Sequence, residues 1–189
     1  TIGVTAQDKR IAGLIQKARK AAIIVLNKWD LVKPGRGEKQ SARELIEETR
    51  SRIFFLHYAP VLVTSASTGE NVARLFASIQ KIQRAAQTRS GTGVLNRLLR
   101  QAFEANPPPL VKGRRLKLFY TTQPRKGGLH QRRARVSSPL HPPEFVLFVN
   151  DPRLMTETYR RYLEARIREA EPYPGLPIIL TLRPRAKDV

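Results

Sequence analysis

The sequence AAIIVLNKWD at residues 21–30 joins a short apolar run to a polar motif. The run at 21–26 is wholly apolar and rich in β-branched residues, which favours a strand buried on both faces of a parallel sheet. Asn27, Lys28 and Asp30 follow it directly, in the pattern Asn-Lys-x-Asp. In an open α/β sheet, ligands bind beyond the carboxyl ends of the strands. The stretch therefore predicts a parallel α/β sheet with a binding loop at the end of this strand.

Helices and strands alternate on both sides of this stretch. Apolar residues at helical spacing predict helices, and short apolar runs predict strands. In chain order the expected elements are a helix at 8–19, a strand at 21–26, a helix at about 40–52, a strand at 60–66 and a helix at 71–87. This order is typical of a doubly wound α/β sheet.

The polar motif has the chemistry of a guanine site. The carboxylate of Asp30 can accept two hydrogen bonds, from the ring imino and exocyclic amino groups of guanine, which adenine cannot supply. The Asn27 amide can bond another edge of the purine, and the Lys28 stem can lie along the base plane. The next strand ends in Thr64-Ser65-Ala66, where the N–H of Ala66 can meet the guanine carbonyl oxygen. The alternative is an ordinary pair of turns at strand ends.

The chain lacks the other parts of a nucleotide-hydrolysing site. It contains no G-x-x-x-x-G-K-[S/T] phosphate loop and no Asp-x-x-Gly Mg²⁺ motif after a strand. No residue is therefore assigned to catalysis or to a metal, and no tightly bound cofactor is expected. We expect a fragment of a larger GTPase, inactive by itself.

Cysteine usage and hydropathy exclude several kinds of site and a membrane-spanning helix. There is no Cys, and the three His are far apart, which excludes disulfides, thiol nucleophiles and the common zinc sites. No apolar run approaches the roughly 20 residues of a membrane span. The first residues show no signal peptide. We therefore expect a soluble, cytoplasmic protein without a membrane partner.

A second domain begins after a polar, glycine-containing linker at 87–93. We place the boundary between domains 1–88 and 89–189. The second is expected to be a small α+β domain with the order α-β-β-α-β. Its elements are a helix from Thr92 that stops at the prolines of 106–109, strands at 114–122 and 145–150, a helix from Asp151 to about Ala170 and a strand at 177–183. In the first of these strands, Leu116, Leu118 and Tyr120 alternate with Arg115, Lys117 and Phe119.

The chain is strongly basic. Lys and Arg number 35 against 15 Asp and Glu, a net charge of +20, and residues 89–189 hold 20 against 8, a difference of +12. Such an excess predicts a polyanionic partner such as RNA. Residues 123–144 are expected to form a long basic hairpin loop. The candidate RNA contacts are Arg125, Lys126, Arg132, Arg133 and Arg135 in that loop, and Lys112, Arg114, Arg115 and Lys117 before it.

Several segments together resemble one protein family. These are VLNKWDLV, TSASTGENV, VLNRLLRQAF, PPLVKGRRLKLFY, FVLFVNDP, TYRRYLEARIRE and GLPIILTLR. They are similar to the Der (EngA) family of bacterial ribosome-assembly GTPases over essentially the whole chain. The similarity covers the second half of that family's second GTP-binding domain, a partial P-loop-type sheet without its N-terminal half, and its KH-like domain.

The resemblance implies two consecutive GTP-binding domains, Mg²⁺-dependent hydrolysis of GTP to GDP and action on the large ribosomal subunit. It places Asn27, Lys28 and Asp30 on the guanine-specificity motif, and Ser65 and Ala66 on the next base-contact loop. The positive charge of residues 89–189 predicts docking of the KH-like domain on rRNA or on the preceding GTP-binding domains of the same chain. The 123–144 loop departs from the family, which joins these strands more briefly.

One alternative stays open. The α/β half can be a degenerate relic within a non-enzymatic RNA-binding module, which explains the missing phosphate loop without truncation. KH domains that clamp single-stranded nucleic acid normally use a G-x-x-G loop between two helices. No such loop lies between the predicted helices here, so the RNA hypothesis rests on charge.

Overall fold

The computed structural model describes residues 3–32, 42–124 and 140–185. The chain forms two compact units. The first comprises Thr1–Gln87 and Pro174–Pro177, and the second comprises Thr88–Tyr173 and Ile178–Val189. The assignment of the short segment Pro174–Pro177 to the first unit was not predicted from the sequence.

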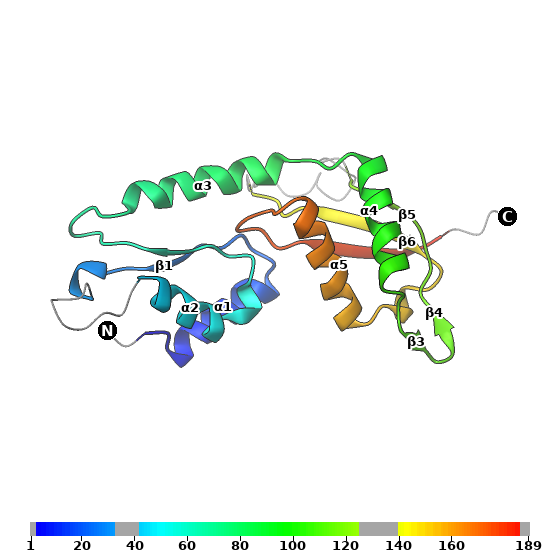
Figure 1. Ribbon diagram of the computed structural model, residues 1–189, viewed down its shortest axis with the longest axis horizontal. Coiled ribbons are helices and arrows are strands. Elements are labelled where there is room, and N and C mark those ends of the chain that lie inside the picture. The colour runs from blue at the N-terminus through cyan, green and yellow to red at the C-terminus, as the bar shows by residue number, and fades with distance from the viewer. Residues whose placement is uncertain (1–2, 33–41, 125–139, 186–189) are drawn as a thin grey trace. The chain divides into compact units, whose positions relative to one another are not determined.

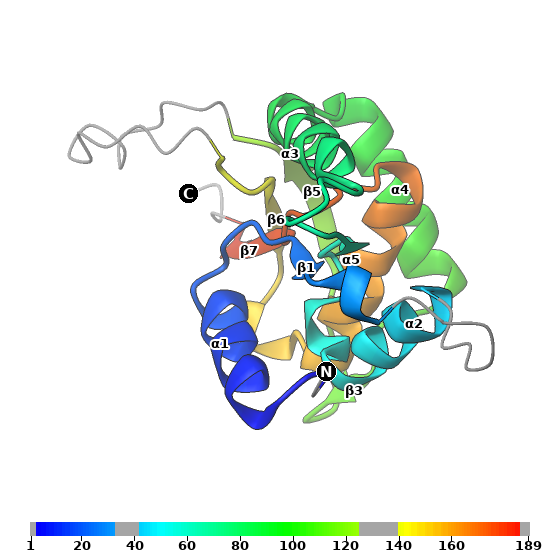
Figure 2. The ribbon, with the colours of Figure 1, turned by 90° about the vertical axis from the view of Figure 1, so that its left-hand side faces the viewer.

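The first unit is a layered α/β structure. Its elements are α1 (Ala6–Lys17), β1 (Ile24–Leu26), the 3₁₀ turn η1 (Trp29–Leu31), α2 (Ala42–Arg52), the 3₁₀ turn η2 (Phe54–Leu56), β2 (Val61–Val63) and α3 (Val72–Gln87). β1 and β2 run parallel. Figures 1 and 2 show α1 and α2 on one side of these strands and α3 on the other. The predicted parallel α/β class is confirmed.

A capping box starts the first helix. The hydroxyl of Thr5 accepts a hydrogen bond from the N–H of Asp8, and the Asp8 carboxylate accepts one from the N–H of Thr5. This exchange satisfies two backbone donors that an open helix end leaves without partners. Buried Ala12 of α1 then joins a core cluster with Ile53, Leu56 and Tyr58.

The prediction that the first strand is buried on both faces is wrong. Val25 is 40% exposed, and Ile24 and Leu26 are only half-buried. Within the described residues β1 pairs with β2 alone, so its other edge has no neighbouring strand. An apolar strand with one neighbour keeps part of its surface in contact with solvent.

The second unit is a three-stranded sheet covered by two helices. Its elements are α4 (Thr92–Ala105), β3 (Leu110–Val111), β4 (Arg114–Arg115), β5 (Leu118–Thr122), β6 (Glu144–Val149), the 3₁₀ turn η4 (Pro152–Leu154), α5 (Glu157–Ala170) and β7 (Ile179–Pro184). The strand order is β5-β6-β7, with β5 antiparallel and β7 parallel to β6. Figures 1 and 2 place α4 and α5 on one face of this sheet. The predicted α-β-β-α-β order holds, with an added β3–β4 hairpin.

The strand predicted at 114–122 is broken in two. β4 ends at Arg115 and β5 begins at Leu118, with buried Leu116 between them. The side chain of Asn150 fixes this break, since it accepts from the N–H of Lys117 at 2.9 Å and donates to the carbonyl of Arg115 at 3.0 Å. A register shift between Leu118 and Tyr120 then interrupts the predicted alternation, so Tyr120 does not share the buried side of Leu116.

The predicted helix start at Asp151-Pro152 is also displaced. Asp151 caps the short η4 turn through a hydrogen bond from the N–H of Arg153. α5 begins only after Thr156, whose hydroxyl accepts from the N–H of Tyr159. The chain therefore uses two caps in succession where the sequence pattern indicated one.

Gly175 occupies a confined position in the first unit. Its N–H donates to the carbonyl of Tyr58 and its carbonyl accepts from the N–H of Ala22. Its φ is +69°, and a Cβ at this position would lie 2.2 Å from the Cδ1 of Ile82. Both the left-handed backbone and the lack of space therefore require glycine.

We expect Gly175→Ala to lower the free energy of unfolding of the first unit by about 3 kcal/mol, through overpacking and left-handed backbone strain. Gly69→Ala is the matched control, because Gly69 has φ +78° with no atom within 4 Å of a built Cβ. Its expected cost is about 1 kcal/mol, from the backbone alone. Trp29 is the single tryptophan and lies in this unit, so its fluorescence during urea denaturation reports both values. Equal losses in the two variants would contradict the packing argument.

Candidate guanine-binding site

Two loops meet at the carboxyl ends of the parallel strands. The loop after β1 contains Asn27, Lys28 and Asp30, and the loop after β2 contains Ser65 and Ala66. The register pairs Leu26 with Val63, so both strands end at the same edge of the sheet. Sequence reasoning placed the motif at this edge, and the structure brings the second loop beside it.

Main-chain hydrogen bonds through Thr64 join the loops. Its N–H donates to the carbonyl of Leu26 at 2.9 Å, and its carbonyl accepts from the N–H of Trp29 at 3.0 Å. Trp29, at the variable position of the motif, is buried. These bonds continue the ladder of the strands one residue into each loop.

Lys28 turns the chain sharply after the strand. It has φ +66° and ψ +37°, a left-handed conformation that is uncommon for a residue with a side chain. The η1 turn follows at once, with the N–H of Leu31 donating to the carbonyl of Lys28. This reversal carries Asp30 back toward the second loop and leaves the Lys28 side chain exposed.

Side chains of the motif bond directly to the second loop. The hydroxyl of Ser65 donates to Oδ1 of Asp30, and it also accepts from the N–H of Thr68 at 3.3 Å. The N–H of Ala66 donates to Oδ1 of Asn27 at 3.0 Å. Ser65 is fully buried and Asp30 is half-buried, so the bond between them is only partly accessible to water. The two loops thus hold both polar side chains of the motif in fixed orientations.

The arrangement differs from the sequence expectation at Ala66. We expected its N–H to meet the carbonyl oxygen of a base, whereas in this structure it donates to Asn27. Contact with a base requires the Ala66 N–H to share or exchange that bond. The bond between Ser65 and Asp30 was not predicted, because the two residues lie 35 positions apart.

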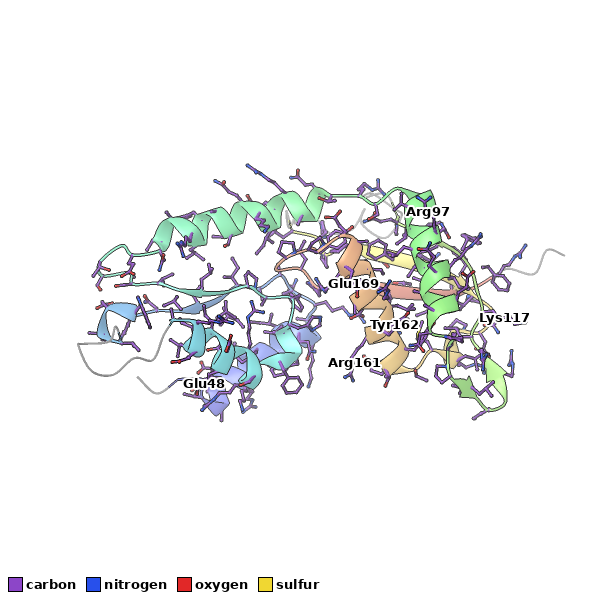
Figure 3. All side chains as sticks on the ribbon, in the orientation of Figure 1. Glu48, Arg97, Lys117, Arg161, Tyr162 and Glu169 are labelled. Carbon is purple, nitrogen blue, oxygen red and sulfur yellow. The ribbon has the colours of Figure 1, made fainter. Side chains whose placement is uncertain are left out.

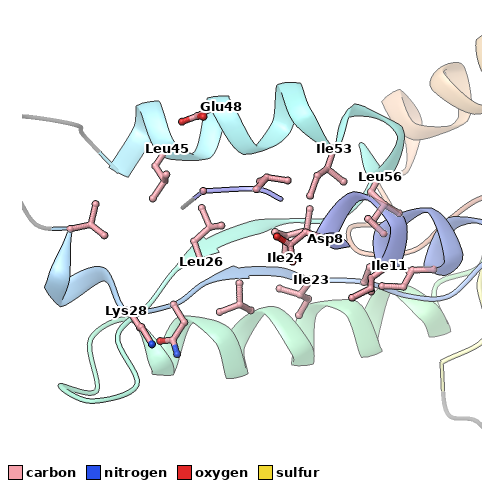
Figure 4. Close-up of a pocket in the computed structure, with 18 of the residues that line it drawn as sticks. Asp8, Ile11, Ile23, Ile24, Leu26, Lys28, Leu45, Glu48, Ile53 and Leu56 are labelled. Carbon is pink, nitrogen blue, oxygen red and sulfur yellow. The ribbon is translucent and has the colours of Figure 1, made fainter. Parts of the chain in front are cut away.

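An apolar groove extends along β1 from this loop. Its volume is about 840 Å³, and Asn27 and Lys28 lie at one end. Figure 4 shows Ile24 and Leu26 of β1 with Ile53 and Leu56 along its wall, and Lys28 at the end of the strand. The groove is lined mainly by apolar side chains, so it suits further protein chain better than a polar ligand.

A second cluster of predicted residues lies on the β3–β4 hairpin. Lys112 and Gly113 form its two-residue turn, with φ +50° and +72°, as type I′ hairpin turns require. Lys112, Arg115 and Lys117 are exposed, and Figure 3 marks Lys117 at this end of the unit. Arg114 instead donates to Oδ2 of Asp151 at 3.3 Å. The basic residues Arg125, Lys126, Arg132, Arg133 and Arg135 lie outside the described residues.

Asp151 is the anchor of this region and was missed as such by sequence reasoning. Its carboxylate accepts bonds from the side chain and the N–H of Arg153 as well as from Arg114. The bonds from Arg153, with the nearby charge of Arg114, hold the pKa of Asp151 below its usual value of 3.8. An Asp followed by Pro and Arg is the sequence signal that could have indicated it.

Within the described ranges, no three His, Asp or Glu side chains are grouped to hold a metal ion. None of the helices described there is long and apolar enough to cross a bilayer.

The comparison with known families agrees with this architecture. Residues 89–183 match the family described as the KH-domain-like C-terminal domain of EngA bacterial GTPase enzymes. The chain belongs to this family. The KH-like domain coincides largely with the second unit, and its sheet is β5-β6-β7.

Relatives extend the similarity over both units. The chain is 43% identical to GTPase Der of Desulforudis audaxviator, 40% to that of Akkermansia muciniphila and 38% to that of Protochlamydia amoebophila, in each case over 98% of its own length. It spans 38%, 39% and 34% of these relatives, respectively. The chain therefore corresponds to little more than a third of the proteins it resembles.

We expect Arg153→Gln to raise the pKa of Asp151 toward its usual value, because the mutation removes the charged donor that contributes most to the shift. The pKa of Asp151 is lower in the folded chain than in the unfolded chain, so ionisation of this carboxylate stabilises the fold. The stabilisation is fully present at pH values above the unfolded-state pKa. It is lost as the pH falls through the lower pKa of the folded state. Asp151→Asn should thus destabilise the second unit at pH 7 and cost progressively less toward pH 2. ¹³C NMR titration and acid denaturation measure the two effects. An unchanged pKa in Arg153→Gln would contradict this assignment.

Proposed function

We propose that this chain is the C-terminal part of a GTP-binding and GTP-hydrolysing factor that acts on the large ribosomal subunit during its assembly. The observation that carries the proposal is the bonding of Asp30 and Asn27 to Ser65 and Ala66 at one edge of a parallel sheet. The names of the relatives and the match to the EngA family support the GTPase part.

The proposed recognition of guanine depends on a fixed carboxylate. Asp30 accepts from the ring N–H and the amino group of guanine, while the Ser65 hydroxyl holds the carboxylate in place. The Asn27 oxygen accepts from Ala66, which directs the amide NH₂ end toward the purine. Lys28 covers the base with its aliphatic stem. Adenine offers no pair of donors to Asp30 and is rejected.

Phosphate and Mg²⁺ chemistry is assigned to the rest of the whole protein. This chain holds no phosphate-loop sequence, so we propose that it does not hydrolyse GTP by itself. The groove beside β1 would receive strands of the preceding GTP-binding part of the same chain. The length of the relatives, which exceeds this chain more than twofold, supports that proposal.

The KH-like unit is proposed to dock on rRNA. Residues 89–189 carry a net charge of +12, and three exposed cations of the hairpin region suit phosphate contacts. Bacterial ribosomes assemble in the cytoplasm, which is therefore the proposed site of action. Docking on the preceding GTP-binding domains is the other use proposed for this basic surface.

Asp30→Asn in the whole protein should lower the affinity for GDP about a hundredfold, since the loss of a charged pair of hydrogen bonds costs about 3 kcal/mol. The same change should create affinity for XDP, because the asparagine NH₂ can donate to the extra carbonyl of xanthine. Isothermal titration of GDP, XDP and ADP measures this exchange of specificity, and the gain for XDP serves as a control for folding.

Retained preference for GDP in Asp30→Asn would overturn the assigned role of Asp30. If the whole wild-type protein binds no guanine nucleotide, the alternative of a non-enzymatic RNA-binding module with a relic α/β half is favoured instead.

Replacing Lys112, Arg115 and Lys117 together by Ala should weaken binding to large-subunit rRNA and reduce the slope of log K against log salt concentration by about 2. Lys9, Arg10 and Lys17 of α1, replaced together by Ala, form the matched control with the same loss of charge. Arg114 is kept, because it is paired with Asp151. Filter binding at several salt concentrations gives both slopes. Equal reductions in the two triple variants would mean that the hairpin makes no specific phosphate contacts.

A further inference from the structure

A row of three side chains crosses the sheet of the KH-like unit. The register pairs Tyr120 of β5 with Phe148 of β6, and Phe148 with Arg183 of β7. Paired residues in neighbouring strands lie on the same face of a sheet. The adjacent residues Thr121 and Leu147 lie on the opposite face and are fully buried, and the main chain of Thr121 bonds to Asn96 of α4. The row therefore faces away from the helices.

The two aromatic rings of the row form an ordered stack. Their centroids are 4.2 Å apart and their planes are inclined by 14°. Tyr120 is nevertheless 41% exposed, although Phe148 covers one face of its ring. Because β5 is an edge strand of this sheet, the second face of the Tyr120 ring points beyond the sheet edge. One flat face of the Tyr120 ring is thus exposed to solvent, and Phe148 supports the opposite face.

A backbone irregularity places Tyr120 in this row. Leu118 pairs with the fully buried Val149, and strict alternation along β5 would put Tyr120 on the same buried side. The register shift between Leu118 and Tyr120 reverses the alternation. β-Bulges commonly redirect a side chain in this way, often at functional sites. The exposure of Tyr120 is therefore a consequence of the backbone conformation of β5.

Cations flank the stack at the end of the sheet. Arg183 is exposed beside Phe148, and the guanidinium of Arg185 lies 5.2 Å from the centroid of the Phe119 ring. In the next row Val146 is buried between the half-buried Thr122 and Thr181, and the exposed acid Glu144 lies two residues before Val146 on the same face. Aromatic surface next to fixed positive charge suits a nucleobase followed by its phosphate.

We propose that this row is a stacking site for the bases of single-stranded RNA. A base lies on the outer face of Tyr120 and continues the Phe148–Tyr120 stack, and Arg183, at the other end of the row, binds a phosphate further along the RNA strand. The proposal rests on the RNA docking proposed above for this unit, and it assigns that docking a component that depends on bases. Bases within an A-form duplex are stacked on each other, so only unpaired segments can bind in this way.

The test measures binding of the full chain to a fluorescein-labelled 12-nucleotide oligo(A) and to an abasic 12-mer of the same backbone. Tyr120→Ala and Tyr120→Leu should each weaken oligo(A) binding about 5- to 150-fold, the range expected for loss of one stacked base. Binding of the abasic strand should not change. Tyr120→Phe should retain wild-type affinity, because it keeps the ring. Phe54→Leu is the control, since Phe54 is an exposed aromatic of the first unit, even more accessible than Tyr120.

Arg183→Ala should instead reduce the slope of log K against log salt concentration by about 0.7 for both the oligo(A) and the abasic strand.

Unchanged oligo(A) affinity in Tyr120→Ala and Tyr120→Leu, with intact thermal transitions, overturns the stacking site. If the Lys112, Arg115 and Lys117 variant still loses affinity in that case, the proposed RNA docking survives without it. No binding of any RNA by the wild-type chain overturns the RNA docking itself.

Discussion

The main chain of Thr64 holds together the two loops on which the candidate site depends. It accepts from Trp29 and donates to Leu26, at the point where both parallel strands end. Thr64 is buried, so neither bond competes with water. These bonds are independent of side-chain identity, which means that pairing of the strands alone brings the loops together. The side chains of Asn27, Asp30 and Ser65 then give the edge its chemistry.

The sequence predicted what short-range patterns determine. The parallel strands, the position of the Asn-Lys-x-Asp loop and the order of elements in the second unit follow from apolar runs, spacing and prolines. The bonds from Ser65 to Asp30 and from Ala66 to Asn27 join residues 35 and 39 positions apart, and no local pattern reveals them. The break before β5 was missed for the same reason, since Asn150 fixes it from 33 positions away. The basic residues at 125–135 lie outside the described structure and stay predictions.

The exposed edge of β1 bears on how the first unit is completed. Val25, Ile11 and Leu14 are exposed, and the groove beside the strand is lined mainly by apolar side chains. Apolar surface of this extent marks a site where another part of a protein binds. This surface favours further strands beside β1, in agreement with relatives that are more than twice as long as this chain.

In the RNA binding proposed for the KH-like unit, exposed cations and the aromatic stack contribute in different ways. Exposed cations on the β3–β4 hairpin attract any polyanion, and this attraction weakens as salt concentration rises. It cannot distinguish a paired segment of rRNA from an unpaired one. A stack such as Phe148–Tyr120 responds to exposed bases and depends little on salt, because no charge is involved. A KH-like domain without a G-x-x-G loop between helices can thus combine general attraction from its hairpin with selection of unpaired RNA by its sheet.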